Sequence, residues 1–134
     1  MASFTPIRLL HTMLRVKDLD KSIAFYTCIL GMKVLRKHDY DEGRFTLAFL
    51  GYENEQTETV IELTHNWDEY EYELGSGFGH LAFAVNDLHT LCDQLLKKNI
   101  VFTKKPAPMR FDTSEMIAFI VDPDDYLIEL IEKT

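Results

Sequence analysis

The sequence predicts an α+β fold built from two copies of one β-α-β-β-β module. The strongest observation is an internal repeat, because His11–Leu19 aligns with His80–Leu88, and both segments start at histidine and end in Asp-Leu. Two shorter motifs recur in the same order: Leu-Ala-Phe at 47–49 as Ile-Ala-Phe at 117–119, and Ile-Glu-Leu at 61–63 again at 128–130. A repeat on this scale organises the whole chain, so each half is expected to fold as one unit of the same kind.

In the first half, a strand is predicted at 9–16, where the residues are apolar and β-rich. Asp18 then begins a helix, because an acidic residue suits the positive end of the helix dipole and apolar residues follow at helical spacing. Gly31 ends this helix. Three further strands complete the module, at 33–38, 44–50 and 59–66.

The second half repeats this order of elements. A strand at 79–85 precedes a helix that begins at Asp87 and ends around Lys97–Asn99. The remaining strands are expected near 101–104, 115–121 and 126–132. We therefore predict one domain with modules at 8–67 and 78–132, joined by a linker at 68–77.

Composition excludes several classes of protein. The 134 residues are 46% hydrophobic, enough for a buried core, and carry a formal charge of −8. An acidic chain without a basic stripe is a poor partner for nucleic acid or an anionic membrane. No apolar run approaches the roughly 18 residues of a membrane span, and no signal peptide is recognisable. The widely spaced Cys28 and Cys92 are expected to be reduced and buried, in a cytoplasmic protein.

Four polar residues at equivalent places of the repeat predict a metal site. His11 matches His80 and Glu62 matches Glu129, each in the middle of a predicted strand. A carboxylate in an apolar strand is costly unless it is paired or metal-bound. A single strand histidine is more often a core or rim residue, and a single glutamate often faces water, but four at matching positions favour a metal. The donor set suits nickel, cobalt, zinc or iron, and does not suit calcium.

Two neighbours share strand faces with these candidates. Arg15 lies four residues after His11, and Asn66 lies four after Glu62. Beside a metal, the arginine could bind a substrate carboxylate and the asparagine a peptide group. An ion pair with a nearby aspartate is the alternative for Arg15. We expect no ligand role for the histidines without a partner in the repeat: His38, His65 and His89.

Five motifs along the chain carry a resemblance to a known family. They are H-T-M-L-R-V-x-D-L-x-x-S-I-x-F-Y from His11, L-G-M at 30–32, V-I-E-L-T-x-N-W at 60–67, G-F-G-H at 77–80 and D-P-D-x-Y-x-I-E-L at 122–130. Together they resemble glyoxalase I, the lactoylglutathione lyase family of the vicinal oxygen chelate superfamily, in its short bacterial-type form. The resemblance extends over nearly the whole chain.

The resemblance implies a fold, an assembly and a reaction. The paired modules would form a curved eight-stranded mixed sheet. A homodimer would place His11 and Glu62 of one subunit opposite His80 and Glu129 of the other, with one divalent metal per interface site. The family, a carbon–sulfur lyase, converts the hemithioacetal of methylglyoxal and glutathione into S-D-lactoylglutathione by proton transfer through an enediolate.

The resemblance also implies roles for individual residues. Glu129 would be the catalytic base, and Glu62 mainly a ligand with a role toward the other stereoisomer. Arg15 and Asn66 fall at glutathione contacts of the family. A basic loop over the glycine carboxylate would contain Lys104, Lys105 and Arg110, for which a solvated loop is the alternative.

The metal and the activity each have alternatives. Histidine at position 11, where some zinc-using members have glutamine, favours the nickel- or cobalt-activated subgroup, although zinc would still bind. Asp125 replaces the usual glycine of the last motif. Aspartate tolerates a positive φ better than most residues, so this departure concerns local strain at the turn and not the function. The competing functions are another metal-dependent enzyme of the superfamily, either an acyl-CoA epimerase or an extradiol dioxygenase, and a metal-free binding module of the same fold.

Overall fold

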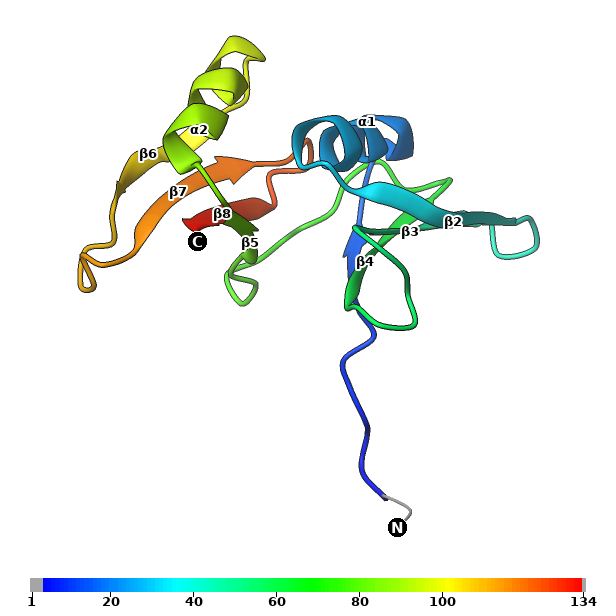
Figure 1. Cartoon of the computed structure of the whole chain (residues 1–134). Helices are drawn as coiled ribbons and strands as arrows, with labels where there is room; N and C mark the ends of the chain where they lie inside the picture. The colour runs from blue at the N-terminus through cyan, green and yellow to red at the C-terminus, as the bar shows by residue number, and fades with distance from the viewer. Residues whose placement is uncertain (1–3, 134) are drawn as a thin grey trace. The chain divides into compact units, whose positions relative to one another are not determined.

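The computed structural model describes residues 4–133 and divides into two compact units, one ending at Tyr72 and the next starting at Glu73. Each unit contains a four-stranded mixed sheet and one helical segment in the order β-α-β-β-β (Figure 1). The predicted α+β fold of paired modules is confirmed, and its eight strands are divided between two sheets.

The first unit contains β1 (His11–Arg15), α1 (Leu19–Ala24), η1 (Phe25–Ile29), β2 (Lys33–Tyr40), β3 (Phe45–Gly51) and β4 (Val60–Asn66). Its strands are ordered β1-β4-β3-β2. The first strand runs parallel to β4, and the other neighbours are antiparallel. This pairing brings the strand of His11 beside the strand of Glu62.

The second unit contains β5 (Leu81–Val85), α2 (Leu88–Lys97), β6 (Phe102–Pro108), β7 (Met116–Val121) and β8 (Leu127–Glu132). The order β5-β8-β7-β6 and the strand directions repeat those of the first unit. His80, directly before β5, therefore comes beside the strand of Glu129.

Both helices begin directly after the aspartates that the sequence indicates. Asp18 caps α1 and Asp87 caps α2, each accepting the backbone N–H three residues on, at 3.2 and 3.1 Å. The first helix continues as the π-helix η1, in which the Thr27 hydroxyl donates to the carbonyl of Ile23 at 2.7 Å. A hydroxyl bonded to the carbonyl four residues back competes with the regular helical ladder. The predicted helix is present, but its second half is wider than an α-helix.

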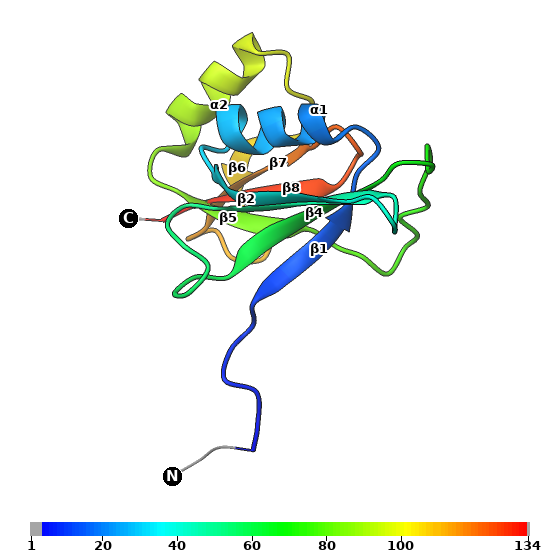
Figure 2. The ribbon, with the colours of Figure 1, turned by 90° about the vertical axis from the view of Figure 1, so that its right-hand side faces the viewer.

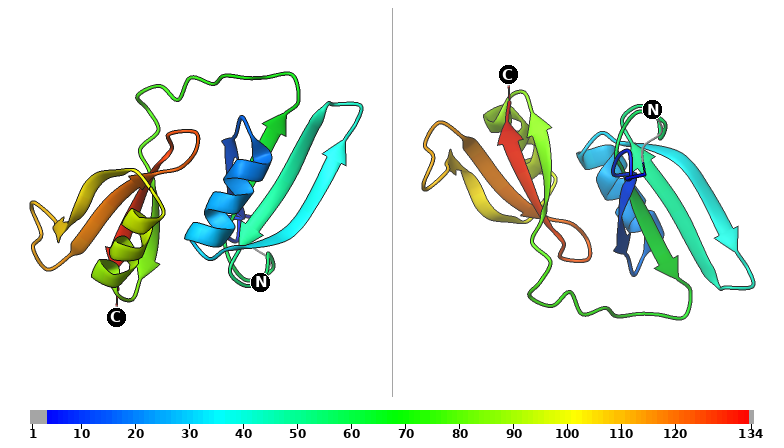
Figure 3. Two further views of the ribbon diagram at one scale, coloured as in Figure 1. Left: turned by 90° about the horizontal axis from the view of Figure 1, so that it is seen from above. Right: turned by 90° about the horizontal axis from the view of Figure 1, so that it is seen from below.

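Each helix lies over one face of its own sheet (Figure 3), and the buried apolar side chains of each unit lie between its helix and its sheet. Side chains alternate along a strand, so the fully buried Leu63 points to the helix side of β4 and Glu62 to the other face. In β8, the buried Ile128 and Leu130 flank Glu129 in the same way. The alternation therefore places both glutamates on the sheet face that the helix does not cover.

Several details correct the sequence predictions. Strand β6 runs to Pro108 instead of ending near 104, because its second half pairs with β7. His11 is the first residue of β1, and His80 precedes β5, so neither histidine is in mid-strand. Cys92 is buried as expected, whereas Cys28, in η1, is exposed, and the expectation that it is buried is wrong.

The segment before β1 is extended and exposed over residues 4–10, and it runs away from the sheet of its own unit (Figure 2). Its end is tied to the loop between β3 and β4, where the Thr59 hydroxyl donates to the carbonyl of Leu9 at 2.8 Å. Within residues 4–133, no helix is long and apolar enough to cross a membrane.

Candidate active site

A histidine–glutamate pair lies on the face of each sheet opposite its helix. In the first unit, Nε2 of His11 is 3.0 Å from Oε1 of Glu62. In the second, Nε2 of His80 is 3.1 Å from Oε1 of Glu129. Exposure also matches, at 37% and 40% for the histidine side chains and 12% and 14% for the glutamates. The repeat found in the sequence is thus also a repeat of side-chain geometry.

A phenylalanine packs against each histidine. The rings of Phe49 and His11 meet edge to face with centroids 5.5 Å apart, and those of Phe119 and His80 do so at 5.4 Å. Each phenylalanine is also the cross-strand neighbour of the glutamate of its own pair. Such packing holds an imidazole in one orientation. Sequence reasoning matched the two Ala-Phe motifs but missed this role.

A cationic residue lies opposite each phenylalanine on the neighbouring antiparallel strand. Arg36 pairs with Phe49, and its guanidinium carbon is 3.7 Å from the ring centroid. Lys104 pairs with Phe119, and both cations follow an irregularity in their strand register. The pKa of Arg36 is raised, chiefly by the hydrogen bond that it donates to Glu55 at 2.7 Å. Arg36 is therefore anchored in place.

The surroundings of the two pairs differ. Thr64 donates its hydroxyl to Oε2 of Glu62 at 3.0 Å, whereas the equivalent position in the second unit is Ile131, which has no side-chain donor. Two of the predicted substrate residues, Arg15 and Asn66, also have no counterpart in the second unit. The positions equivalent to Arg15 and Asn66 are occupied there by alanine and lysine. The repeat therefore retains the candidate ligands and diverges around them.

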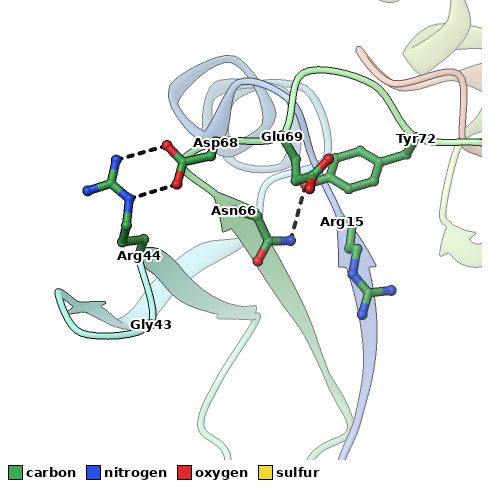
Figure 4. Close-up of a pocket in the computed structure, with 7 residues that line it drawn as sticks. All are labelled: Arg15, Gly43, Arg44, Asn66, Asp68, Glu69 and Tyr72. Carbon is green, nitrogen blue, oxygen red and sulfur yellow. Dashed lines mark hydrogen bonds and ion pairs between the residues drawn. The ribbon is translucent and has the colours of Figure 1, made fainter.

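A cavity of about 520 Å³ opens in the first unit (Figure 4). It is lined by Arg15, Gly43, Arg44, Asn66, Asp68, Glu69 and Tyr72. The amide of Asn66 donates to the hydroxyl of Tyr72 at 3.1 Å. The structure thus brings the two predicted glutathione contacts, Arg15 and Asn66, to one cavity.

An ion pair forms one side of this cavity. Arg44 donates two hydrogen bonds to Asp68, at 2.7 and 2.8 Å, and these hold the pKa of the aspartate below its ordinary value. The guanidinium of Arg44 is therefore already engaged, although it belongs to the lining. Neither Arg44 nor Tyr72 was singled out from the sequence, because nothing in the repeat marks them.

The remaining residues considered from the sequence lie outside the lining of this cavity. Lys104 and Lys105 belong to strand β6, so the expectation that they form a loop with Arg110 is wrong for both lysines. Arg110 is in the loop after β6, with its guanidinium carbon 5.0 Å from the ring centroid of Phe111. His65 is not a partner of Glu62; its Nδ1 lies 3.3 Å from the carbonyl of Val16.

The structure presents the four candidate ligands as two pairs. Among residues 4–133, no group of three or more histidine, cysteine, aspartate or glutamate side chains converges into a metal site. Each pair offers an imidazole nitrogen and a carboxylate oxygen 3.0–3.1 Å apart. Two donors at that separation can both bind one ion at the usual distances of about 2.0–2.2 Å. Each pair thus fits a borderline divalent metal and supplies half of a four-donor set.

Known proteins match this chain along nearly its whole length. The model of the Glyoxalase/Bleomycin resistance protein/Dioxygenase superfamily matches residues 8–130. A probable lactoylglutathione lyase of Synechocystis is 55% identical over 94% of this chain and 95% of its own. The lactoylglutathione lyase of Neisseria meningitidis is 51% identical over 95% of this chain and 91% of its own.

A solved structure agrees. The crystal structure of glyoxalase I from Zea mays matches 95% of this chain with a TM-score of 0.90 and 42% identity, and this chain spans 45% of the maize chain. The chain therefore belongs to the Glyoxalase/Bleomycin resistance protein/Dioxygenase superfamily and, within it, to the glyoxalase I (lactoylglutathione lyase) family.

Proposed function

We propose that this chain isomerises the hemithioacetal of methylglyoxal and glutathione to S-D-lactoylglutathione at a divalent-metal site shared by two copies of the chain. In the homodimer, His11 and Glu62 of one protomer would face His80 and Glu129 of the other. The observation that carries the proposal is the match between the two pairs in donor type, spacing and exposure, one in each unit. A four-donor site needs two such pairs to meet.

The reaction class follows from the family. Lactoylglutathione lyases are carbon–sulfur lyases, and relatives of that name match more than nine-tenths of this chain at about half identity. The chain is an enzyme of this class. The family therefore favours the lyase over the epimerase, the dioxygenase and the metal-free binding module.

Nickel or cobalt is the proposed resident ion, one per site, with zinc able to bind in its place. The support is the donor set, since imidazole nitrogen and carboxylate oxygen suit these borderline ions. When bound, the ion would act as a Lewis acid and stabilise negative charge on the two adjacent substrate oxygens.

Glu129 is the proposed base. It would take the proton from the carbon bonded to sulfur and return it to the neighbouring carbon, while the hydroxyl proton passes from the first oxygen to the second. The products of these shifts are the thioester carbonyl and the new hydroxyl, so no redox partner is needed. Glu62 would serve mainly as a ligand, with a role toward the other stereoisomer of the hemithioacetal.

Arg15 and Asn66 would bind glutathione in the cavity of the first unit. A guanidinium can bind a carboxylate through two hydrogen bonds, and the Asn66 amide could exchange its bond to Tyr72 for one to a peptide group. Lys104 and Arg110 are proposed for the glycine carboxylate. These local cations must offset the repulsion between an anionic thiol and a chain of charge −8.

A cytoplasmic location is part of the proposal. Both cysteines are free thiols, as expected in a reducing compartment. Fractionation of cells that express the protein would test it, and recovery of the protein outside the cytosolic fraction would contradict it.

The metal and the base can be tested in one titration. Protein dialysed against chelator receives nickel, cobalt, zinc or magnesium singly, and thioester formation from methylglyoxal and glutathione is followed. We expect turnover with nickel or cobalt. Glu129→Gln should abolish turnover while retaining part of the metal binding, and Glu71→Gln, in an exposed loop of the first unit, should behave as wild type. Absence of thioester with every ion would refute the activity.

The shared site can be tested by complementation. His11→Ala and His80→Ala chains should each be inactive alone, because every site then lacks one ligand. Unfolding and refolding the two variants together forms mixed dimers, in which one site has all four ligands and the other has none of the histidines. Recovery of part of the activity is expected only if the site lies between chains, so mixtures without activity would contradict the homodimer proposal.

A further inference from the structure

We propose that the Thr64 hydroxyl is a positioning group that holds Glu62 as a fixed metal ligand, and that the second histidine–glutamate pair lacks this restraint. The inference rests on the metal site proposed above. The hydroxyl of Thr64 donates to Oε2 of Glu62 at 3.0 Å, while Oε1 lies 3.0 Å from Nε2 of His11. Both oxygens of Glu62 therefore have a partner within the first unit.

Thr64 is suited to be a rigid donor. The residue is only 6% exposed, and it shares a face of β4 with Glu62 because the two are two residues apart. A β-branched side chain has restricted rotation at χ1, and pairing with Arg15 in β1 fixes the backbone of Thr64. The carboxylate plane is thus set before an ion arrives, which removes part of the ordering cost of binding.

The second unit has no counterpart of this hydroxyl. Ile131 occupies the position of Thr64, and its side chain has nothing to donate. Oε1 of Glu129 lies 3.1 Å from Nε2 of His80, but Oε2 receives no side-chain hydrogen bond from any residue in the range 4–133. A terminal carboxylate torsion has a broad energy profile, so a carboxylate held at one oxygen can still turn.

The difference separates the two glutamates by mobility. A ligand that only holds an ion gains from a fixed orientation, whereas a group that moves a proton between neighbouring carbons must reorient. The restraint on Glu62 and the freedom of Glu129 therefore match the ligand and base roles proposed for them, and they give those roles a structural cause in one substitution within the repeat, threonine against isoleucine.

Nickel affinity of the apo-protein, measured by calorimetry, tests the role of Thr64. Thr64→Val should weaken binding by about tenfold or more, the usual cost of losing a group that orients a ligand, and Thr64→Ser should restore most of it. The matched control is Thr46→Val, because Thr46 is 5% exposed in the same sheet and donates to Asp39 at 2.7 Å, away from the pair. That control should bind nickel as wild type does.

The reciprocal variant, Ile131→Thr, adds a hydroxyl beside Glu129 and covers the case in which Thr64→Val does not fold. It should bind nickel at least as tightly as wild type and show a lower kcat. The inference is overturned if Thr64→Val binds within about twofold of wild type, if Thr46→Val is weakened equally, or if Ile131→Thr keeps its kcat. Weaker nickel binding by Thr64→Val in a protein that makes no thioester would refute the proposed activity and leave this inference standing.

Discussion

Asp122 holds together the turn that leads into the strand of Glu129, and its removal has a calculable cost. Asp122 is only 3% exposed, and its Oδ1 accepts hydrogen bonds from the backbone N–H groups of Asp124 and Tyr126 at 2.8 and 2.9 Å. Hydrogen bonds to a charged group contribute about 1.5–3 kcal/mol each. Asp122→Ala loses two and leaves both amides buried, so we expect a loss of about 3–5 kcal/mol. Asp122→Asn keeps an acceptor oxygen and should lose about 1–2 kcal/mol.

The measurement is urea denaturation of the wild type, Asp122→Ala and Asp122→Asn, followed by far-ultraviolet circular dichroism. The matched control is Asp112→Ala, because Asp112 accepts the backbone N–H of Ser114 in an exposed turn of the same unit. Water can replace that bond, so the control should lose far less stability than Asp122→Ala. A loss below about 1 kcal/mol for Asp122→Ala, or one equal to the control, would refute the reasoning.

Three further outcomes are expected. Asp125 has φ +68°, so Asp125→Gly should relieve strain and stabilise the fold by about 0.5 kcal/mol, seen as a higher urea midpoint; a lower midpoint would contradict this. Burial raises the pKa of the Cys92 thiol to about 11, so a thiol reagent at neutral pH should label only Cys28 in the native protein and both in urea; labelling of both without urea would contradict the assignment. Leu130→Ala and Leu63→Ala each empty a fully buried position and should cost about 3–4 kcal/mol, whereas a loss under about 1 kcal/mol would mean that the core closes over the space.

The prediction of the fold succeeded because its signals are local and occur twice. Strand and helix periodicity, an aspartate at each helix start and a glycine at the end of the first helix can be read within a few residues. The π-helix η1 was not predicted, because it depends on a single hydrogen bond from the Thr27 hydroxyl to a backbone carbonyl. The full length of β6 was not predicted, because a segment with two prolines and two lysines forms a strand only where a neighbouring strand pairs with it.

The candidate site was predictable in its chemistry and not in its surroundings. Equivalent places in the repeat identified the two histidines and two glutamates, since a charge in an apolar strand stands out in any sequence. The side chains that contact them lie either on other strands or two residues away on the same strand face. Phe49 and Arg36 come to Glu62 only through the order β4-β3-β2.

By itself, the sequence determined that this chain is a duplicated module in which one histidine and one glutamate recur at equivalent places of the two halves. Tertiary structure decided that each pair closes to 3.0–3.1 Å, that a phenylalanine packs on each histidine, and that the hydroxyl of Thr64 donates to Glu62. The physical reason is the reach of each signal. Periodicity and charge are properties of neighbouring residues, whereas each histidine–glutamate contact joins residues about fifty positions apart that neighbouring parallel strands bring together, and only the register of the sheet selects which side chains meet.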